Sequence, residues 1–314
     1  MNYEPSTMNS PTLIVIAGPT AIGKTAAAIR LAQHFNTVIL SADSRQFYKQ
    51  MSIGTAKPTT DELTAAQHYF IGSHSVTESF SVGDFEKQGL ELLGELFTIH
   101  NVVILVGGSG LYIKAICEGF DDIPIADEGI REKLNLELQE NGLGHLLEKL
   151  KTADREYYSE VDLNNPQRII RALEVFESTG NTFSSYRLAN TNTRLFNIIK
   201  IALDMPRKLL YDRINQRVDI MMKEGLLDEV KSLIPYRHLN ALQTVGYSEL
   251  FDHLDGKLEL NTAVEKIKQN TRRFAKRQLT WFRKDKDFHW IEANENLHNT
   301  LLDYITSLLK SSNT

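Results

Sequence analysis

Short apolar runs alternate with longer helix-like segments along the first third of the chain. Three runs are rich in Ile, Val and Leu and are followed by small or acidic residues: residues 12–17, 37–40 and 101–106. Runs of this length, bounded by turn-forming residues, predict buried strands. Three further segments have the composition of helices: residues 25–35, 84–97 and 111–117. The pattern therefore predicts a parallel sheet with helices on both faces.

Polar residues follow each of the three expected strands. The first strand leads into residues 18–25, the second into 41–44 and the third into 107–110. Ligands of open parallel sheets bind beyond the C-terminal ends of the strands. We therefore expect these three loops to build one site.

The pattern changes in the middle of the chain. Residues 130–189 are polar and helical with no convincing strand, and strand character returns at 194–203. Helices follow to about residue 284, and 287–291 could be a last strand. We expect a loose tail over 1–11, an α/β core over 12–120 plus 194–314, and an all-helical insertion domain over 121–193.

Composition narrows the class of protein. Apolar residues make up 42% and charged residues 24% of 314 residues, which is typical of globular proteins. No apolar run approaches the roughly 20 residues of a membrane span, so no membrane association is expected. Cys117 is the single cysteine, which excludes an internal disulfide and favours the cytoplasm. The net charge of -5 argues against a coating nucleic-acid binder, but a local basic face remains compatible with it.

The first loop carries a phosphate-binding motif. Its residues match G-x-x-x-x-G-K-[ST] and lie between a strand and a helix, as the motif requires: Gly18, Pro19, Thr20, Ala21, Ile22, Gly23, Lys24 and Thr25. The backbone N–H groups would face phosphate oxygens, Lys24 would supply a positive charge, and the Thr25 hydroxyl could hold Mg²⁺. The motif predicts a P-loop NTPase-like fold and a phosphate-bearing ligand.

The third strand lacks the terminal Asp that holds Mg²⁺ in ordinary ATPases, because it ends in Gly107 and Gly108. The nearest acid at a strand end is Asp43. Its carboxylate could serve as general base toward an acceptor, support a metal, or only cap a helix N-terminus.

Three basic stretches offer further binding groups. Gln167, Arg168 and Arg171 share one face of a predicted helix that Asn165 caps and Pro166 begins. Residues 268–286 carry eight positive and one negative side chain with interleaved aromatic residues, which suits phosphate binding. Arg213 and Arg217 lie one helical turn apart, and either could reach the phosphate site. From spacing alone, each stretch could also be a solvated surface or, for the last, a surface ion pair.

Together these stretches resemble the tRNA dimethylallyltransferases, the bacterial-type tRNA isopentenyltransferases, over about residues 12–292. The segments that carry the resemblance, in family order, are GPTAIGKT at 18–25, SADSRQFYKQMSIGTAKP at 41–58, VGGSGLYIKAI at 106–116, NNPQRIIRALEVF at 164–176, QTVGY at 243–247 and FAKRQLTWFRKD at 274–285.

The resemblance implies transfer of a dimethylallyl group from its diphosphate to N6 of the adenine 3′-adjacent to the anticodon in tRNA. It implies Asp43 as general base, and Thr20 and Arg217 as groups that act on the diphosphate and its transition state. Lys24, the loop amides and Mg²⁺ at Thr25 would stabilise charge on the leaving diphosphate. It also implies a monomer whose helical insertion grips the anticodon arm. The implied tRNA contacts are Asp43, Ser44, Arg45, Gln46, Ser109, Arg131, Gln167, Arg168, Ile169, Ile170, Arg171, Gln243, Thr244, Val245, Gly246, Tyr247, Lys276, Arg277 and Arg283.

The sequence departs from the family at two of these segments. Ser109 stands where Thr is usual, which keeps the hydroxyl, and Ser248 stands where a basic residue is usual, which puts one phosphate contact in doubt. Three alternatives have less support. An adenylate isopentenyltransferase would not need the insertion or the basic helix, a P-loop kinase would not need the 164–176 motif, and a non-catalytic RNA-binding protein would not need Lys24, Thr25 and Asp43 together.

Overall fold

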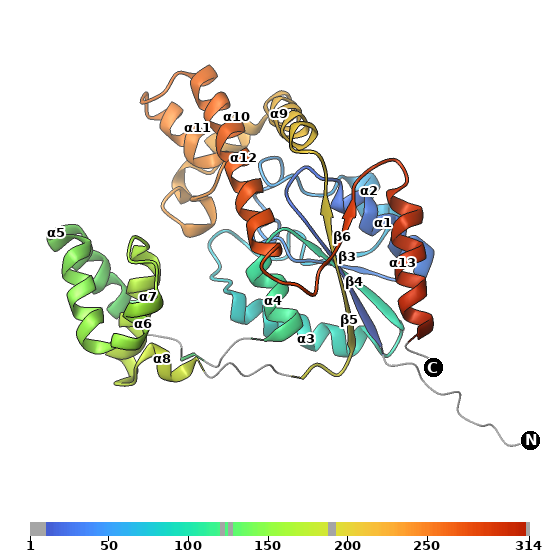
Figure 1. Cartoon of the computed structure of the whole chain (residues 1–314). Helices are drawn as coiled ribbons and strands as arrows, with labels where there is room; N and C mark the ends of the chain where they lie inside the picture. Colours follow the sequence, from blue (N-terminus) through green and yellow to red (C-terminus); the bar gives the residue numbers. More distant parts are fainter. Residues whose placement is uncertain (1–10, 120–122, 125–127, 188–192, 312–314) are drawn as a thin grey trace, which may run out of the picture. The chain divides into compact units, whose positions relative to one another are not determined.

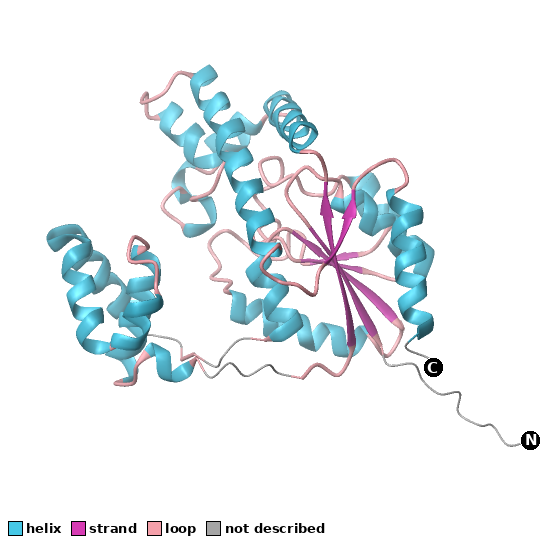
Figure 2. Cartoon of the chain, in the orientation of Figure 1, coloured by secondary structure: helices cyan, strands magenta, loops and turns pink. Residues whose placement is uncertain are grey.

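The computed structural model describes residues 11–119, 123–124, 128–187 and 193–311. The chain divides into two compact units, one formed by Met1–Cys117 with Arg194–Thr314 and the other by Glu118–Thr193. The first unit contains the sheet and the second is helical (Figures 1 and 2). Of the expected N-terminal tail, residues 1–10 lie outside the described residues.

The larger unit is built on a six-stranded parallel sheet with the strand order β3-β2-β4-β1-β5-β6. Its strands are β1 (Thr12–Ala17), β2 (Ile39–Ser41), β3 (His68–Tyr69), β4 (Val102–Gly107), β5 (Asn197–Asp204) and β6 (His289–Glu292). The central strands β1 and β4 are buried along their whole length. Such burial is typical of parallel strands covered on both faces, and it confirms the predicted fold class.

Helices cover both faces of this sheet. The helices nearest to it are α1 (Lys24–Phe35), α2 (Thr60–Ala65), α3 (Val82–Leu96), α4 (Gly110–Glu118) and α13 (Leu297–Ser311). Side chains of β1 alternate between two cores because successive residues of a strand point to opposite faces. Ile14 and Ile16 pack with α1 and α13, whereas Leu13 and Val15 pack with α3 and α4.

A group of helices follows β5 and builds a third core in the same unit (Figure 1). It consists of α9 (Arg207–Lys223), α10 (Leu226–Ser232), the 3-10 turns Ile234–Tyr236 and Asn240–Leu242, α11 (Tyr247–Leu254) and α12 (Leu260–Phe282). Its core includes Tyr48 and Met51, which belong to the loop after β2. The helices therefore hold that loop over the end of the sheet.

The smaller unit is helical within its described residues. Its helices are α5 (Glu128–Ala153), α6 (Arg155–Glu160), α7 (Pro166–Thr179) and α8 (Phe183–Tyr186). Gly142 has a φ of 76°, and it divides α5 into two helical segments. The Asn165 side chain accepts a hydrogen bond from the Arg168 N–H, and Pro166 lies in the first turn, so the predicted start of α7 is confirmed.

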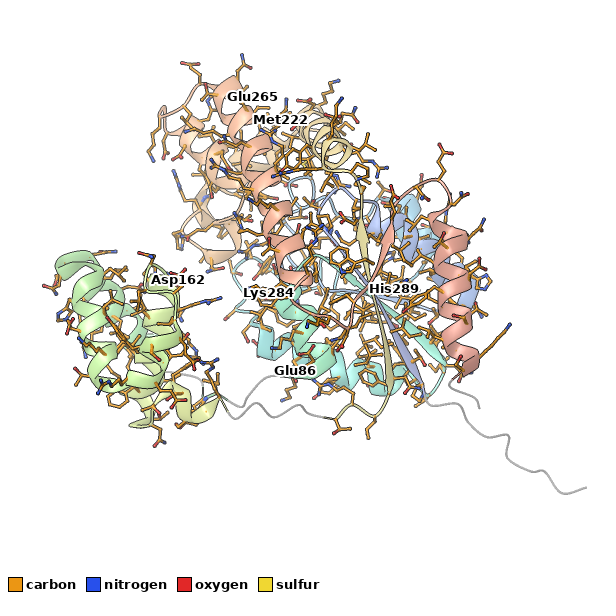
Figure 3. The ribbon with its side chains drawn as sticks, in the orientation of Figure 1. Glu86, Asp162, Met222, Glu265, Lys284 and His289 are labelled. Carbon is orange, nitrogen blue, oxygen red and sulfur yellow. The ribbon has the colours of Figure 1, made fainter. Side chains whose placement is uncertain are left out.

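Arg194 secures the point at which the chain re-enters the larger unit. Its guanidinium pairs with Glu86 of α3 at 2.9 Å and donates to the carbonyls of Ala115 and Ile116 near the end of α4. Figure 3 labels Glu86 on its helix. These bonds connect the segment that leads into the helical unit with the segment that leaves it.

Three elements of the sheet region were not predicted, namely β3, α2 and α13. β3 has only two residues and α2 has six, so neither shows a readable hydrophobic period. None of the described helices is long and apolar enough to cross a lipid bilayer.

Candidate functional site

The phosphate-binding loop joins β1 to α1, as its motif predicts. Gly23 has a φ of 103° and directly precedes α1, so the free N–H groups of the first helical turn face the loop. Ala21 has a φ of 64°, which is strained for a residue with a side chain. The loop backbone therefore has the conformation in which its N–H groups can face an anion.

Lys24 points back across this loop. Its ammonium donates to the carbonyl of Pro19 at 2.7 Å. Desolvation by burial lowers the pKa of Lys24 to about 8, although the nearby charge of Asp43 raises it and that of Arg217 lowers it. A bound diphosphate would supply the negative charge that this desolvated ammonium lacks.

Asp43 lies in the loop after β2, at the C-terminal edge of the sheet. Its carboxylate accepts a hydrogen bond from the Arg45 N–H at 3.0 Å, and it caps a turn instead of an α-helix. The Ser109 hydroxyl accepts from the Ser44 N–H at 3.0 Å, which joins the loops after β2 and β4. The polar residues after the two strands thus come together as the sheet topology predicts.

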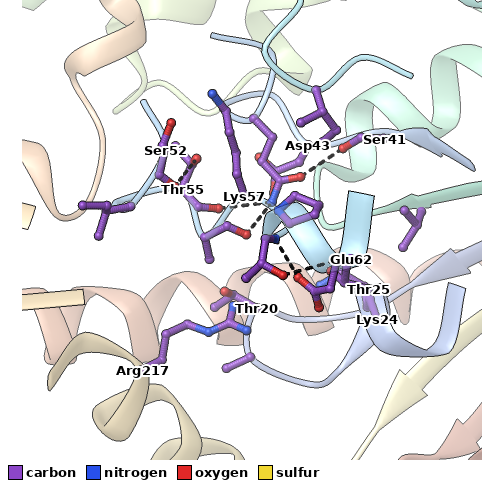
Figure 4. A pocket seen from close by; sticks show the side chains of 18 of the residues that line it. Thr20, Lys24, Thr25, Ser41, Asp43, Ser52, Thr55, Lys57, Glu62 and Arg217 are labelled. Carbon is purple, nitrogen blue, oxygen red and sulfur yellow. Dashed lines mark hydrogen bonds between the residues drawn. The ribbon is translucent and has the colours of Figure 1, made fainter. Parts of the chain in front are cut away.

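A cavity of about 650 Å³ opens over the phosphate-binding loop (Figure 4). Lys24, Thr25, Lys57 and Glu62 are among its lining residues. Arg217 reaches from α9 toward Thr20 (Figure 4). Basic groups and backbone amides thus face one space, which suits a diphosphate.

A second cavity, of about 210 Å³, adjoins the first. It brings together residues of the loops after β2 and β4 with the QTVGY segment, namely Ser44, Arg45, Ser109, Thr244, Val245 and Gly246. Seven residues line both cavities: Thr20, Asp43, Thr55, Ala56, Arg217, Met221 and Phe274. The three predicted catalytic residues are therefore all at the junction.

Arg213 and Arg217 differ in their surroundings. The Arg213 guanidinium donates to the Ile22 carbonyl at 3.3 Å, and this residue lines neither of the two cavities. Arg217 lines both, and desolvation lowers its pKa from the ordinary value. The geometry thus separates two arginines that spacing alone left equivalent.

Gln46 and Glu229 hold the loop that closes one side of the first cavity. The Gln46 amide donates to the carbonyls of Thr55 and Ala56 at 3.2 and 3.1 Å. Glu229 of α10 accepts from the N–H groups of residues 52, 53 and 54 at 2.8–3.0 Å, and from the Tyr247 hydroxyl at 2.7 Å. Glu229 could not be identified from the sequence, because a lone acid on an amphipathic helix is typical of a solvated face.

Tyr247 does not offer its side chain to a ligand. It is fully buried, and its ring fills the space beside Gly54 so closely that a Cβ there would lie 2.6 Å from the ring. The prediction of Tyr247 as a side-chain contact to tRNA is therefore wrong. Gln243, Thr244 and Val245 of the same segment are exposed or half-buried.

The helical unit carries the predicted tRNA-gripping face of α7. Gln167 and Arg168 are exposed. Ile169 and Ile170 are buried in the core of this unit, so the prediction that their side chains contact tRNA is wrong. They belong to the opposite, apolar stripe of the amphipathic helix.

Arg131 and Arg171 converge on one buried acid. Arg131 pairs with both carboxylate oxygens of Glu174, and Arg171 lies 3.6 Å from the same carboxylate. Arg171 also donates to the Pro124 carbonyl at 3.0 Å. Both guanidinium groups remain partly exposed, so each keeps donors for a further anion.

The basic side of α12 is exposed, as the sequence predicts. Lys276, Arg277 and Arg283 are solvent-accessible. The Arg277 guanidinium lies 5.6 Å from the centre of the Phe274 ring, and Arg283 pairs with Asp204 at 2.8 Å. The helix thus presents cations beside an aromatic ring that lines both cavities.

The residues present fit a magnesium ion held mainly by substrate. Among the described residues, no group of three or more acidic, His or Cys side chains could hold a metal. Thr25 offers its hydroxyl within the first cavity. Mg²⁺ commonly keeps several waters and takes few protein ligands when substrate phosphates bind it.

Comparisons with known proteins agree on one family. The IPP transferase family model matches residues 46–285. A tRNA dimethylallyltransferase of Christiangramia forsetii is 54% identical, with 95% of this chain and 99% of that protein covered. The tRNA dimethylallyltransferase 1 of Bacteroides thetaiotaomicron is 49% identical over 94% of this chain and 95% of that protein.

Solved structures give the same result. The tRNA isopentenylpyrophosphate transferase of Bacillus halodurans is 37% identical with a TM-score of 0.71, covering 96% of this chain and 98% of that one. A eukaryotic dimethylallyltransferase, crystallised acting on tRNA, is 24% identical and shares the fold with a TM-score of 0.78, covering 95% of this chain and 80% of that one. Motif, fold and relatives together show that this chain belongs to the IPP transferase family, that of the tRNA dimethylallyltransferases.

Proposed function

We propose that this protein transfers a dimethylallyl group from dimethylallyl diphosphate to N6 of the adenine 3′-adjacent to the anticodon in tRNA. The single observation that carries the proposal is the junction of the two cavities, which Thr20, Asp43 and Arg217 all line. The first cavity suits the diphosphate because it lies over the phosphate-binding loop. The second suits an adenine that has left its stack in the anticodon loop.

The reaction forms a bond between N6 and C1 of the dimethylallyl group and breaks the bond between C1 and the diphosphate oxygen. The N6 proton passes to the Asp43 carboxylate, and the bonding electrons leave with the diphosphate. Lys24, the loop amides and Arg217 stabilise the charge that grows on the leaving group. Mg²⁺ at Thr25, when bound, supplies further positive charge to the diphosphate oxygens.

The apolar part of the junction suits the group that is transferred. Met221 and Phe274 line both cavities, so they border the space between diphosphate and adenine. Their side chains would enclose the dimethylallyl group and exclude water from an activated carbon. Exclusion of water favours transfer to the amine over hydrolysis.

The tRNA would be held by two sets of groups on different units. Gln167, Arg168 and the Arg131–Arg171 pair of the helical unit would contact the anticodon arm, and Lys276, Arg277 and Arg283 of α12 would contact its phosphates. We propose that one chain acts alone. A tRNA substrate also favours action in the cytoplasm.

The experiment offers two acceptors to the purified protein with Mg²⁺ and dimethylallyl diphosphate. One is unmodified tRNA with A next to the anticodon, and the other is AMP. Nucleoside mass spectrometry then detects an added C5H8 unit on adenosine. We expect alkylated tRNA and unchanged AMP. Alkylated AMP with unchanged tRNA would contradict the proposal and favour an adenylate isopentenyltransferase, and ATP consumption with neither product would favour a kinase.

A further inference from the structure

The Gln278 side chain joins two loops of the site from the inward face of α12. It is 6% exposed, whereas its neighbours Lys276 and Arg277 are exposed on the other side of the helix. Its Oε1 accepts from the Thr20 N–H at 2.9 Å, and its Nε2 donates to the Gly108 carbonyl at 2.9 Å. A primary amide makes both bonds at once without a change of protonation.

The bond to Thr20 fixes a complete peptide unit. The Thr20 N–H and the Pro19 carbonyl belong to the same trans peptide, so they point in opposite directions. The N–H is held by Gln278, and the carbonyl accepts from the Lys24 ammonium at 2.7 Å. Gln278 and Lys24 therefore hold this peptide from opposite sides.

The contact with the second loop depends on close approach. A Cβ at position 108 would lie 2.3 Å from Nε2 of Gln278, so only glycine leaves room for the amide there. Gly108 is followed by Ser109, whose hydroxyl is bonded to Ser44 beside Asp43. One amide thus sets the spacing between the diphosphate loop and the loop next to the general base.

We propose that Gln278 is a positioning residue for dimethylallyl transfer. It orients the Pro19–Thr20 peptide, and through that peptide it places the Lys24 ammonium and the Thr20 side chain against the diphosphate. The same helix, α12, also carries Lys276 and Arg277. One rigid element therefore contacts the tRNA phosphates and positions the diphosphate loop. This role deepens the proposed function and rests on it.

The test replaces the amide with an isosteric acid, Gln278→Glu. One carboxylate oxygen still accepts from the Thr20 N–H, but the other faces the Gly108 carbonyl and donates only when the acid is protonated. The control is Gln269→Glu, which adds the same charge on the same helix at an exposed position. We measure kcat/KM for dimethylallyl diphosphate between pH 5.5 and 8 and take the ratio of variant to control at each pH.

We expect this ratio to be about 0.1 or lower at pH 8, because an unpaired buried carbonyl and a misplaced loop together cost at least about tenfold. It should rise several-fold toward pH 5.5, since protonation restores the donor. Gln278→Met, which offers neither a donor nor an acceptor of this kind, should lose activity at every pH. A ratio near 1 at all pH values, or a loss in Gln278→Glu without recovery in acid, would overturn the positioning role.

A binding measurement separates this proposal from the proposed function. Isothermal calorimetry with inorganic diphosphate and Mg²⁺ reports the loop directly, without any transfer reaction. The Kd ratio of Gln278→Glu to Gln269→Glu should follow the same pH dependence. If the wild-type protein binds diphosphate but alkylates no tRNA, the proposed function fails while this ratio still decides the role of Gln278. Equal Kd values for the two variants at pH 8 would contradict that role.

Discussion

At the scale of single residues, the site combines a desolvated cation with an acid across one cavity. Lys24 has a pKa lowered to about 8, chiefly by desolvation, with Asp43 raising it and Arg217 lowering it. A dianionic ligand strongly stabilises a desolvated ammonium, because the ligand supplies the negative charge that the loop lacks. The bond to the Pro19 carbonyl holds the Lys24 ammonium within the loop.

Deprotonation of Lys24 should therefore cause kcat/KM to fall at alkaline pH. The free enzyme loses the Lys24 proton as the pH rises through about 8, so kcat/KM for dimethylallyl diphosphate should fall above that pH. Below pH 8 the ammonium is charged and this group imposes no loss. Steady-state rates from pH 7 to 9.5 measure the effect. Lys24→Arg, which stays charged throughout, should have a lower kcat/KM that is flat over this range. A flat wild-type profile to pH 9.5 would contradict the assignment.

Residues of the site could be predicted from the sequence where they belong to a motif with fixed spacing. The eight residues of the phosphate-binding loop and Asp43 line or adjoin one site because strand ends of a parallel sheet meet at one edge. Glu229 and Gln278 were not predicted, since their backbone partners lie 170 or more positions away in the chain. Ile169, Ile170 and Tyr247 were misassigned because a motif does not say which of its side chains point inward.

At the scale of elements, α10 anchors the loop after β2. The Glu229 carboxylate accepts three consecutive backbone N–H groups and one hydroxyl, all within 3.0 Å. An acid that receives four donors satisfies nearly all of its acceptor positions. This anchoring holds residues 52–56 in the conformation in which two of their carbonyls accept hydrogen bonds from the Gln46 amide.

Glu229→Gln should lower the free energy of unfolding by about 1–3 kcal/mol, because an amide nitrogen would face backbone donors that need an acceptor. Thermal or urea unfolding measures this change. The matched control is Asp228→Asn on the same helix, whose partner Lys231 is solvent-exposed and whose loss should change stability by no more than about 0.5 kcal/mol. Equal stability of both variants would show that Glu229 does not anchor the loop.

The contribution of α12 to tRNA binding can be tested separately from catalysis. Lys276→Ala and Arg277→Ala should weaken tRNA binding and should each reduce the slope of log K against log salt by about 1, provided that each side chain neutralises one phosphate. Fluorescence titration with unmodified tRNA at several salt concentrations measures the slope. Lys310→Ala, at the exposed end of α13, removes the same charge elsewhere. Slopes that match this control would place the tRNA phosphates on another surface.

At the scale of the whole molecule, the chain consists of an α/β unit with the reaction site and a helical unit with its own core. The parallel sheet was predictable because fully buried strands alternate with amphipathic helices. The third core was not, since its members come from the loop after β2 and from helices about 170 residues later. A hydrophobic period identifies an element, but it does not identify what that element packs against.

We propose that transfer to tRNA takes place at the junction of the two cavities, with Asp43 as base. The most direct measurement is the single-turnover rate of Asp43→Asn with saturating tRNA and dimethylallyl diphosphate, together with its tRNA Kd. We expect a rate reduced by about 10²–10⁴-fold at an unchanged Kd, because the isosteric amide keeps the shape of the cavity but cannot accept the N6 proton. A rate within about threefold of wild type would contradict Asp43 as the general base, and with it the catalytic role of the junction.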